Sequence, residues 1–293
     1  MPWPSRNRRP HRLATIVKLG ERYGLYRISA MGVAASQPAL GGFSQGAPAS
    51  VQATQAPHGR SPARGFCSYR VRLETDPAEW VVFDECCHIT ISRFFRDRGV
   101  FEILRRRVLP NIAARARREG RDARIWSAGC ASGEEPYTLR ILWDLEVASS
   151  FPSVSLSIIA TEIDEALLGR AQEGCFEATS LHELPGHLVS QAFDQIGPRF
   201  CIKPSHRQGI EFRCQDLRIE MPAPAFDLIL CRYVAFTYFA APLQRSVLDR
   251  IVDQLAPGGY IVIGSHEKLP DAGAALLPLP GAPQIFTNRA VSL

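Results

Sequence analysis

From residue 124 onward, short apolar runs alternate with amphipathic stretches along the chain. The apolar runs have the length of β-strands, whereas the stretches between them repeat apolar positions every three or four residues, as helices do. This alternation predicts a mainly parallel, twisted sheet with helices on both faces. The predicted strands are 124–128, 155–161, 199–202, 209–213, 225–231, 260–264 and 284–288, and the predicted helices are 135–148, 164–172 and 243–255. The glycines at 258 and 259 are expected to form a turn that stops the last helix.

The residues before this alternation divide into two parts. Residues 1–65 contain a long stretch rich in Ala, Gly, Pro, Ser and Gln with few large apolar side chains, so we expect a disordered tail. Residues 66–118 are predicted to form a short helical segment, with apolar positions at helical spacing before Pro110. Residues 119–293 then form the main domain.

The net charge of +5 is unevenly distributed. Residues 1–65 have nine Arg or Lys and one Glu, a net charge of +8, which leaves −3 for the rest of the chain. A mildly acidic folded part lacks the basic surface that nucleic-acid binding needs. The basic start could contact anionic surfaces, although such runs are more often solvated tails. Since no apolar run approaches the roughly 20 residues of a membrane helix, and no signal peptide is evident, we expect a cytoplasmic protein.

Eight cysteines are spread along the chain without a C-x-x-C pair, and no His stands at zinc-ligand spacing from them. Several lie inside apolar runs, where a free cysteine packs as a small hydrophobe. We therefore expect reduced, structural thiols rather than disulfides, and no metal site. The cysteines are Cys67, Cys86, Cys87, Cys130, Cys175, Cys201, Cys214 and Cys231.

The segment 126–137 has the strongest chemical signal. Gly129 and Gly133 lie among small residues after an apolar run, and a helix is predicted to begin at Glu134 and Glu135. Small residues let the backbone approach a ligand, which the amides at the helix N-terminus then face. Two carboxylates there argue against a phosphate and favour a ligand that is cationic or rich in hydroxyls. S-adenosylmethionine, with its sulfonium, ammonium and ribose diol, fits. In the alternative interpretation, one glutamate simply caps the helix.

Two more segments follow predicted strands, and the carboxyl ends of parallel strands are where ligands bind in such sheets. Glu162 ends one strand, where a carboxylate can accept hydrogen bonds from a ribose diol. Alternatively, Asp164 is the cap of the next helix and Glu162 is only its neighbour. Residues 231–234 close the strand 225–231.

Four blocks of sequence, at 90–97, 126–137, 160–164 and 226–239, resemble those of a known family. On these blocks the chain is similar to the CheR-type protein-glutamate O-methyltransferases of bacterial chemotaxis, which use S-adenosylmethionine. The resemblance covers roughly residues 75–288. It implies the class I methyltransferase fold, which is Rossmann-like, with a small β-rich insertion at 174–215.

The resemblance also implies which residues hold the methyl donor. Thr90 and Ser92 stand where the family usually has Asn and Thr, and Tyr233 stands where it has Asn. Glu135 matches the family's ligand-binding glutamate, whereas Glu162 replaces an Asp that holds the ribose. The implied cofactor-binding residues are Thr90, Ser92, Arg96, Gly129, Gly133, Glu135, Glu162, Asp216, Leu217, Tyr233 and Val234, with Asp216 and Leu217 lining the adenine.

Methyl transfer to a carboxylate needs little from the protein, because a carboxylate is already ionised at neutral pH and requires no general base. Alignment and removal of water remain, and these account for several kcal/mol of the barrier. The resemblance implies catalytic roles for Arg96, which would hold one oxygen of the acceptor carboxylate, and Tyr238, which would orient the nucleophile. The alternatives are an ion pair of Arg96 with Asp97 or Glu102, and packing of Tyr238 in the core.

The sequence therefore predicts a chemotaxis-related methyltransferase that acts on a carboxylate, with a protein glutamate as the favoured acceptor. Two alternatives stay open. The changed residues at Thr90 and Tyr233 would also suit a cofactor-binding module without turnover. Only about 20 ordered-looking residues precede the block 90–97, where the family has a helical domain that binds receptors. Docking on a chemoreceptor is therefore not expected, and a small-molecule acceptor is the second alternative.

Overall fold

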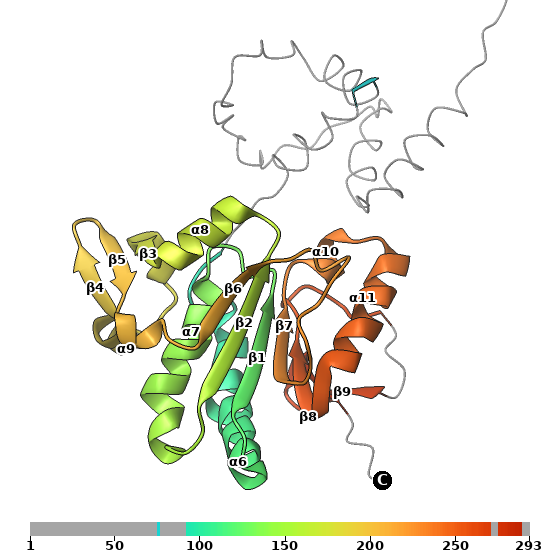
Figure 1. Cartoon of the computed structure of the whole chain (residues 1–293), viewed down its shortest axis with the longest axis horizontal. Helices are drawn as coiled ribbons and strands as arrows, with labels where there is room; N and C mark the ends of the chain where they lie inside the picture. Colours follow the sequence, from blue (N-terminus) through green and yellow to red (C-terminus); the bar gives the residue numbers. More distant parts are fainter. Residues whose placement is uncertain (1–74, 77–91, 271–274, 289–293) are drawn as a thin grey trace, which may run out of the picture. The chain divides into compact units, whose positions relative to one another are not determined.

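A seven-stranded sheet forms the centre of the structure, a computed structural model that describes residues 75–76, 92–270 and 275–288. Residues 92–270 and 275–288 belong to one compact unit (Figure 1). The strands run in the order β6-β2-β1-β7-β8-β10-β9. Their bounds are β1 Ala123–Ala128, β2 Leu156–Glu162, β6 Ile210–Cys214, β7 Phe226–Cys231, β8 Leu255–Val262, β9 Leu276–Leu279 and β10 Ala282–Asn288.

The sheet is mainly parallel, as predicted. Strands β6, β2, β1, β7 and β8 pair in parallel, and β10 is antiparallel to both β8 and β9. Strand β1 has β2 on one side and β7 on the other, so the strand order reverses beside it. Such a reversal leaves a crevice at the carboxyl ends of the strands.

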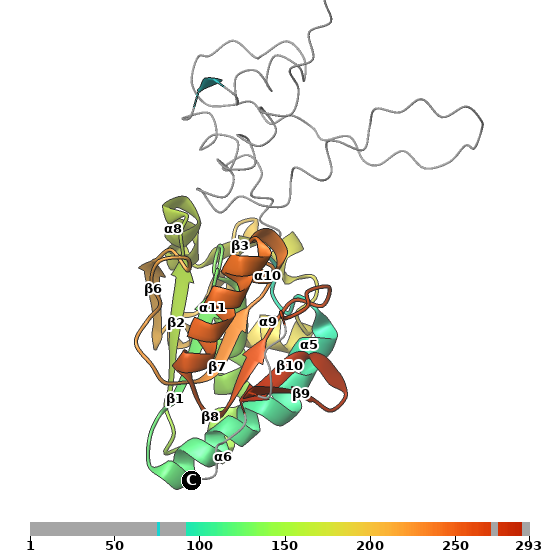
Figure 2. The same cartoon turned by 90° about the vertical axis from the view of Figure 1, so that its right-hand side faces the viewer.

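Helices cover both faces of the sheet, because neighbouring residues of a strand point to opposite sides. Ile125 and Leu228 pack in one apolar core with α5, α6 and α7, whereas Trp126 and Ile229 pack in another with α11. Figure 2 turns α11 toward the viewer. The helix bounds are α5 Arg98–Ile103, α6 Leu109–Glu119, α7 Glu134–Leu142, α8 Glu165–Glu173, α9 Gly186–Ala192, α10 Ala235–Tyr238 and α11 Ala241–Gln254.

The predicted N-terminal helical segment is continuous from Arg98 to Glu119 and passes through Pro110. Pro110 is the second residue of α6, directly after a change of helix type. The wider turns of a π-helical stretch, Leu104–Val108, precede it. The predicted tail, 1–65, lies outside the described residues, so the predicted domain boundaries remain predictions.

A second, antiparallel sheet of three strands lies beside α8 and α9, at the left of Figure 1. Its strands are β3 Cys175–Glu177, β5 Arg199–Ile202 and β4 Phe193–Ile196. The predicted strand at 209–213 does not belong to it, because β6 pairs with β2 at the edge of the large sheet. Of the predicted insertion at 174–215, only 175–202 therefore forms the separate sheet.

Gly258 and Gly259 lie at an irregularity within β8, where Gly258 has φ 69°, rather than in a separate turn that ends the helix. Helix α11 ends at Gln254 and passes directly into β8, which contains both glycines and has a shifted register against β7. A Cβ on Gly259 would come within 2.8 Å of the Ala256 carbonyl oxygen and 3.0 Å of that of Phe226. Glycine serves here because two backbone segments approach closely, which the sequence pattern does not distinguish from a turn.

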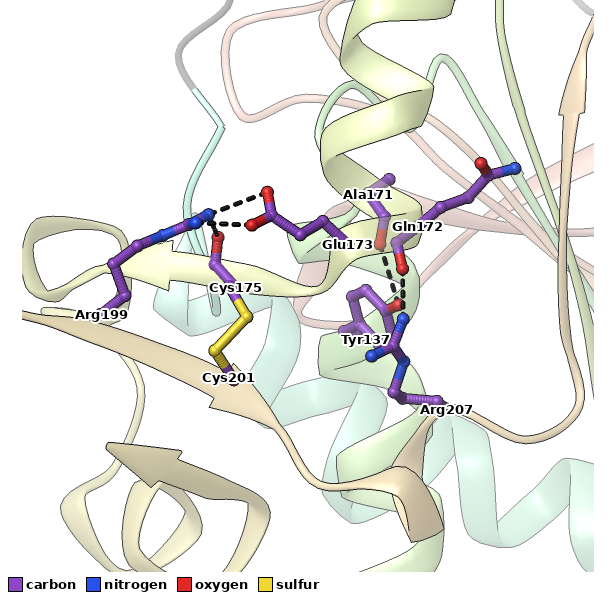
Figure 3. Close-up of a disulfide and its surroundings, with 8 residues drawn as sticks. All are labelled: Tyr137, Ala171, Gln172, Glu173, Cys175, Arg199, Cys201 and Arg207. Carbon is purple, nitrogen blue, oxygen red and sulfur yellow. Dashed lines mark hydrogen bonds and ion pairs between the residues drawn. A yellow bond between two sulfur atoms is a disulfide. The ribbon is translucent and has the colours of Figure 1, made fainter. Parts of the chain in front are cut away.

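The expectation of reduced thiols fails for one pair, because Cys175 and Cys201 form a disulfide (Figure 3). The two residues face each other across β3 and β5, with their Cα atoms 4.0 Å apart. Their separation of 26 residues gives no sign of this cross-strand pairing. Cys130, Cys214 and Cys231 are free, and Cys130 and Cys231 are buried as small hydrophobes.

Within the described residues, none of the helices is long and apolar enough to cross a membrane. The cytoplasmic location expected from the sequence stays a prediction. The same part of the chain contains no group of three or more His, Cys, Asp and Glu side chains placed to hold a metal ion.

Candidate active site

The carboxyl ends of β1, β2 and β7 bring the three predicted segments together. Ala128, the last residue of β1, is in register with Thr161 of β2 and with Cys231 of β7. Neighbouring strands lie about 5 Å apart. The glycine loop, Glu162 and the segment after Cys231 therefore begin side by side at one edge of the sheet.

The glycine loop is tied to β2 and packed closely against its neighbours. The amides of Gly129 and Cys130 donate hydrogen bonds to the Thr161 carbonyl, over 2.8 and 2.9 Å. A Cβ on Gly129 would lie 2.3 Å from a methyl of Val234, and one on Gly133 would lie 2.8 Å from the Cβ of Ala171. Both predicted glycines thus have a structural reason, since any side chain would push the loop away from the segment after β7 or from α8.

Glu135 is fixed at both carboxylate oxygens. Ser127 Oγ donates a hydrogen bond to Oε1, and Arg232 Nη1 forms an ion pair with Oε2, each over 2.7 Å. The N-cap of α7 is Gly133, and the buried Glu134 accepts hydrogen bonds from Ser132 Oγ. The alternative of a glutamate cap is therefore wrong, and Glu135 instead links β1 to the segment after β7.

Glu162, at the end of β2, binds the backbone of the glycine loop. Its Oε2 accepts a hydrogen bond from the Ala131 amide over 2.9 Å, and its Oε1 accepts one from the Ile163 amide over 2.8 Å. Asp164 is the N-cap of α8, accepting hydrogen bonds from the amides of Ala166 and Leu167. Asp164 is thus the helix cap, and Glu162 is in addition a separate anchor of the glycine loop.

Arg232 joins Glu135 to the N-terminal block. It is only 7% exposed, and its Nη2 donates to Asp97 Oδ2 and to the Arg96 carbonyl, each over 2.8 Å. Burial opposes the charged form of Arg232, but Glu135 and Asp97 outweigh it and raise its pKa. At Asp97, burial is likewise outweighed by hydrogen bonds from Tyr233 and Arg232, which lower the pKa of its carboxyl.

Tyr233 occupies the same network. Its hydroxyl donates to Asp97 Oδ2 over 2.6 Å, and the Arg96 guanidinium lies over its ring, 3.9 Å from the centroid. Its amide donates to Glu267 Oε2 over 2.9 Å. Sequence reasoning missed Arg232, Asp97 and Glu267 as site residues, although Arg232 directly follows an apolar strand that was predicted to end at the site.

The CheR methyltransferase SAM-binding domain matches residues 90–279 of the chain. The chain belongs to this family. A chemotaxis protein methyltransferase of Listeria monocytogenes is 34% identical over 204 residues, which cover 70% of this chain and 75% of that protein. Another from Listeria innocua is 34% identical, over 62% of this chain and 66% of its own length. Chemotaxis protein methyltransferase 1 of Pseudomonas aeruginosa is 35% identical, over 60% of this chain and 65% of its own length. The matched region spans about two thirds of the length of these CheR relatives.

Among solved structures, the N-methyltransferase NodS from Bradyrhizobium japonicum is similar with a TM-score of 0.34 and 18% identity, over 66% of this chain and 98% of that one. The class I fold of this CheR domain is evident from its own strand order, with β10 as the single antiparallel strand of the large sheet as described.

In the part of the chain that the structure describes, non-glycine residues in the left-handed region lie at this CheR site. Among the described residues they are Phe95, Asp97, Ala131 and Tyr233, with φ between 49° and 64°. Residues with a Cβ rarely adopt a left-handed backbone conformation. Strained residues of this kind cluster where a site must be held in one geometry. Their positions in the 90–97 block, the glycine loop and the segment after β7 mark one preorganised region.

The other predicted site residues differ in burial, and one of them lies outside the described residues. Thr90 lies outside the described residues, and Ser92 is partly buried just before the block's phenylalanines. Asp216 receives hydrogen bonds from Arg218, which outweigh burial and lower the pKa of its carboxyl. Leu217 is buried in the core on the α11 side of the sheet. Tyr238 is 44% exposed at the end of α10, so its alternative role in core packing is wrong.

The residues at this edge fit S-adenosylmethionine. Gln215 follows β6, and its backbone amide donates a hydrogen bond to the backbone carbonyl of Glu162. Its buried side-chain oxygen, Oε1, has no hydrogen-bond partner among the described residues. A buried oxygen of this kind is costly unless a donor reaches it, and an adenine amino group is such a donor. Burial first, and then Glu162 and Glu135, raise the pKa of the Cys130 thiol. Glu162 and Glu135 thus both act on this thiol as negative charges, the sign that complements a sulfonium or an ammonium.

Proposed function

We propose that the chain transfers the methyl group of S-adenosylmethionine to a carboxylate, with a glutamate side chain of a protein as the acceptor. The main observation behind the proposal is the fixed pair of Glu135 and Glu162 on either side of the glycine loop. Carboxylates so placed complement a cationic, hydroxyl-bearing donor. Family membership and the unsatisfied Gln215 support the same ligand.

In this proposal each residue has a simple task. Glu162 accepts from the ribose hydroxyls, Glu135 attracts the cationic end of the donor, and Gln215 accepts from the adenine. The bound donor supplies an electrophilic methyl group on a positively charged sulfur. A carboxylate oxygen of the acceptor forms the new C–O bond as the C–S bond breaks, and the electron pair of that bond goes to sulfur.

Arg96 is proposed to bind the acceptor carboxylate. A guanidinium presents two parallel donors to a carboxylate, and it can hold one oxygen while leaving the other free to attack. The half-exposed Tyr238 is proposed to orient the attacking oxygen at the rim of the site. Neither residue needs to remove a proton, because the acceptor is ionised at neutral pH.

The test uses the full chain, S-adenosylmethionine labelled at its methyl group, and a lysate of the source organism. We expect label on protein that mild base releases as methanol, since methyl esters are base-labile and methyl groups on nitrogen are not. Glu135→Ala should abolish the signal, while Glu165→Ala on the exposed part of α8 should leave it unchanged. Label confined to small molecules would establish a small-molecule acceptor, and bound cofactor without any transfer would establish a binding module.

A further inference from the structure

Arg96 is held between two backbone residues in an unusual conformation. Phe95 has φ 61° and Asp97 has φ 64°, in the left-handed region that favours glycine. Phe95 is fully buried, and its amide donates to Thr138 Oγ1 over 3.2 Å. Asp97 accepts hydrogen bonds from Arg232 and Tyr233. The backbone at Arg96 is therefore fixed on both sides, while its side chain extends to the ring of Tyr233.

Tyr233 is itself fixed from several directions. Its backbone is left-handed, with φ 58°, and its amide is held by Glu267. Its hydroxyl donates to Asp97 and accepts from the Ser265 amide over 3.0 Å. Gly264 leaves room for the ring, because a Cβ there would come within 2.6 to 2.8 Å of three ring atoms. Strained backbone that is this well supported marks a side chain with a defined position.

We propose that Tyr233 is a positioning residue, which holds the Arg96 guanidinium on the face of its ring in the orientation that binds the acceptor carboxylate. The inference rests on the proposed function. The short distance of 3.9 Å from the guanidinium carbon to the ring centroid is typical of a cation–π contact. A second guanidinium, that of Arg232, lies 5.7 Å from the same centroid and is neutralised by Glu135 and Asp97.

The role of Tyr233 differs from a contact with the methyl donor. Its hydroxyl is engaged by Asp97 and Ser265, and its ring by Arg96. The Asn that the family usually has at this place offers no ring face to a guanidinium. The chain therefore supports Arg96 by a route of its own, and the effect of losing Tyr233 should pass through Arg96.

A double-mutant cycle tests this dependence. Tyr233→Leu should lower the rate of base-labile protein methylation at saturating S-adenosylmethionine by about 3- to 30-fold, the range of a partly buried cation–π contact. Arg96→Ala should lower it further, and the double variant should match Arg96→Ala within about twofold, because the ring acts only through the guanidinium. Tyr233→Phe, which keeps the ring, should lose less than Tyr233→Leu. Affinity for S-adenosylhomocysteine, measured by calorimetry, should change by less than about threefold in Tyr233→Leu.

Gly264→Ala provides a second approach if Tyr233→Leu does not fold. The added methyl group should displace the Tyr233 ring while the side chains of Arg96 and Tyr233 themselves stay unchanged in identity. It should therefore reduce the methylation rate of the protein that has Arg96, but not the rate of the Arg96→Ala variant. The positioning role would be overturned if Tyr233→Leu and Gly264→Ala each lowered the rate by the same factor with and without Arg96. It would also be overturned if the affinity for S-adenosylhomocysteine fell as much as the rate. Absence of base-labile label with the unaltered protein would instead overturn the proposed function, and the inference with it.

Discussion

Arg232 and Glu135 form a buried ion pair of 2.7 Å that connects the end of β7 to the first turn of α7. The side chain of Arg232 is 4% exposed and that of Glu135 is 14% exposed, so water screens the pair weakly. Because Arg232 also binds Asp97, the same guanidinium holds together three segments that are far apart in sequence. The geometry of the candidate site therefore depends on a residue that sequence reasoning did not select.

Replacing Arg232 with Met should destabilise the fold by about 3–5 kcal/mol, since it leaves two partly buried carboxylates, Glu135 and Asp97, without the guanidinium that neutralises them. Urea unfolding of both proteins measures the difference. Arg213→Ala, which breaks the exposed pair with Glu211, is the matched control and should cost less than about 1 kcal/mol. Equal losses in the two variants would show that the buried pair is no more important than a surface one.

Glu162→Ala should weaken binding of S-adenosylmethionine by about 10- to 100-fold, because the carboxylate both accepts from the ligand and anchors the loop at Ala131. Glu162→Asp keeps the charge and should lose less. Calorimetry gives the dissociation constants, with Glu165→Ala, three residues further on at the exposed start of α8, as the control. An unchanged affinity in Glu162→Ala would remove this residue from the site.

Gln215→Leu should have opposite effects on the free and the bound protein. Removing a buried oxygen that has no partner among the described residues should leave the free protein as stable or raise its melting temperature. The same change should weaken S-adenosylhomocysteine binding by about tenfold, because the adenine loses an acceptor. A loss of stability in the free protein, with unchanged affinity, would show that Gln215 is a structural residue.

Stability should fall at acidic pH through Asp227, whose side chain is 1% exposed. Burial raises the pKa of this carboxyl, but Arg121, the Arg124 amide and Arg115 outweigh it, and the pKa lies below its ordinary value of 3.8. The stabilisation is thus complete above pH 3.8 and is lost as the pH falls through the lowered pKa. Urea unfolding between pH 6 and pH 2 should show the advantage over Asp227→Asn shrinking. A constant difference would contradict this.

The sequence pattern was sufficient for the parts of the fold that depend on local periodicity. Glu135 and Glu162 were found because each directly follows a loop or strand, and parallel strands bring such ends together. Arg232 was missed because its partners, Asp97 and Glu135, come from other segments. The disulfide was missed for the same reason, since the register of β3 and β5 places Cys175 opposite Cys201. The strand β9 was missed because it is short and contains Pro278, which is uncommon in strand interiors.

The end of α8 shows how the small sheet is attached to the rest of the domain (Figure 3). Arg199 of β5 binds Glu173 and the Cys175 carbonyl, and the disulfide crosses from Cys175 to Cys201 within two residues of the helix end. Tyr137 of α7 binds the Ala171 carbonyl at the same end of α8. The small sheet is thus linked through α8 to Gly133 of the glycine loop, so its attachment and the shape of that loop depend on the same helix.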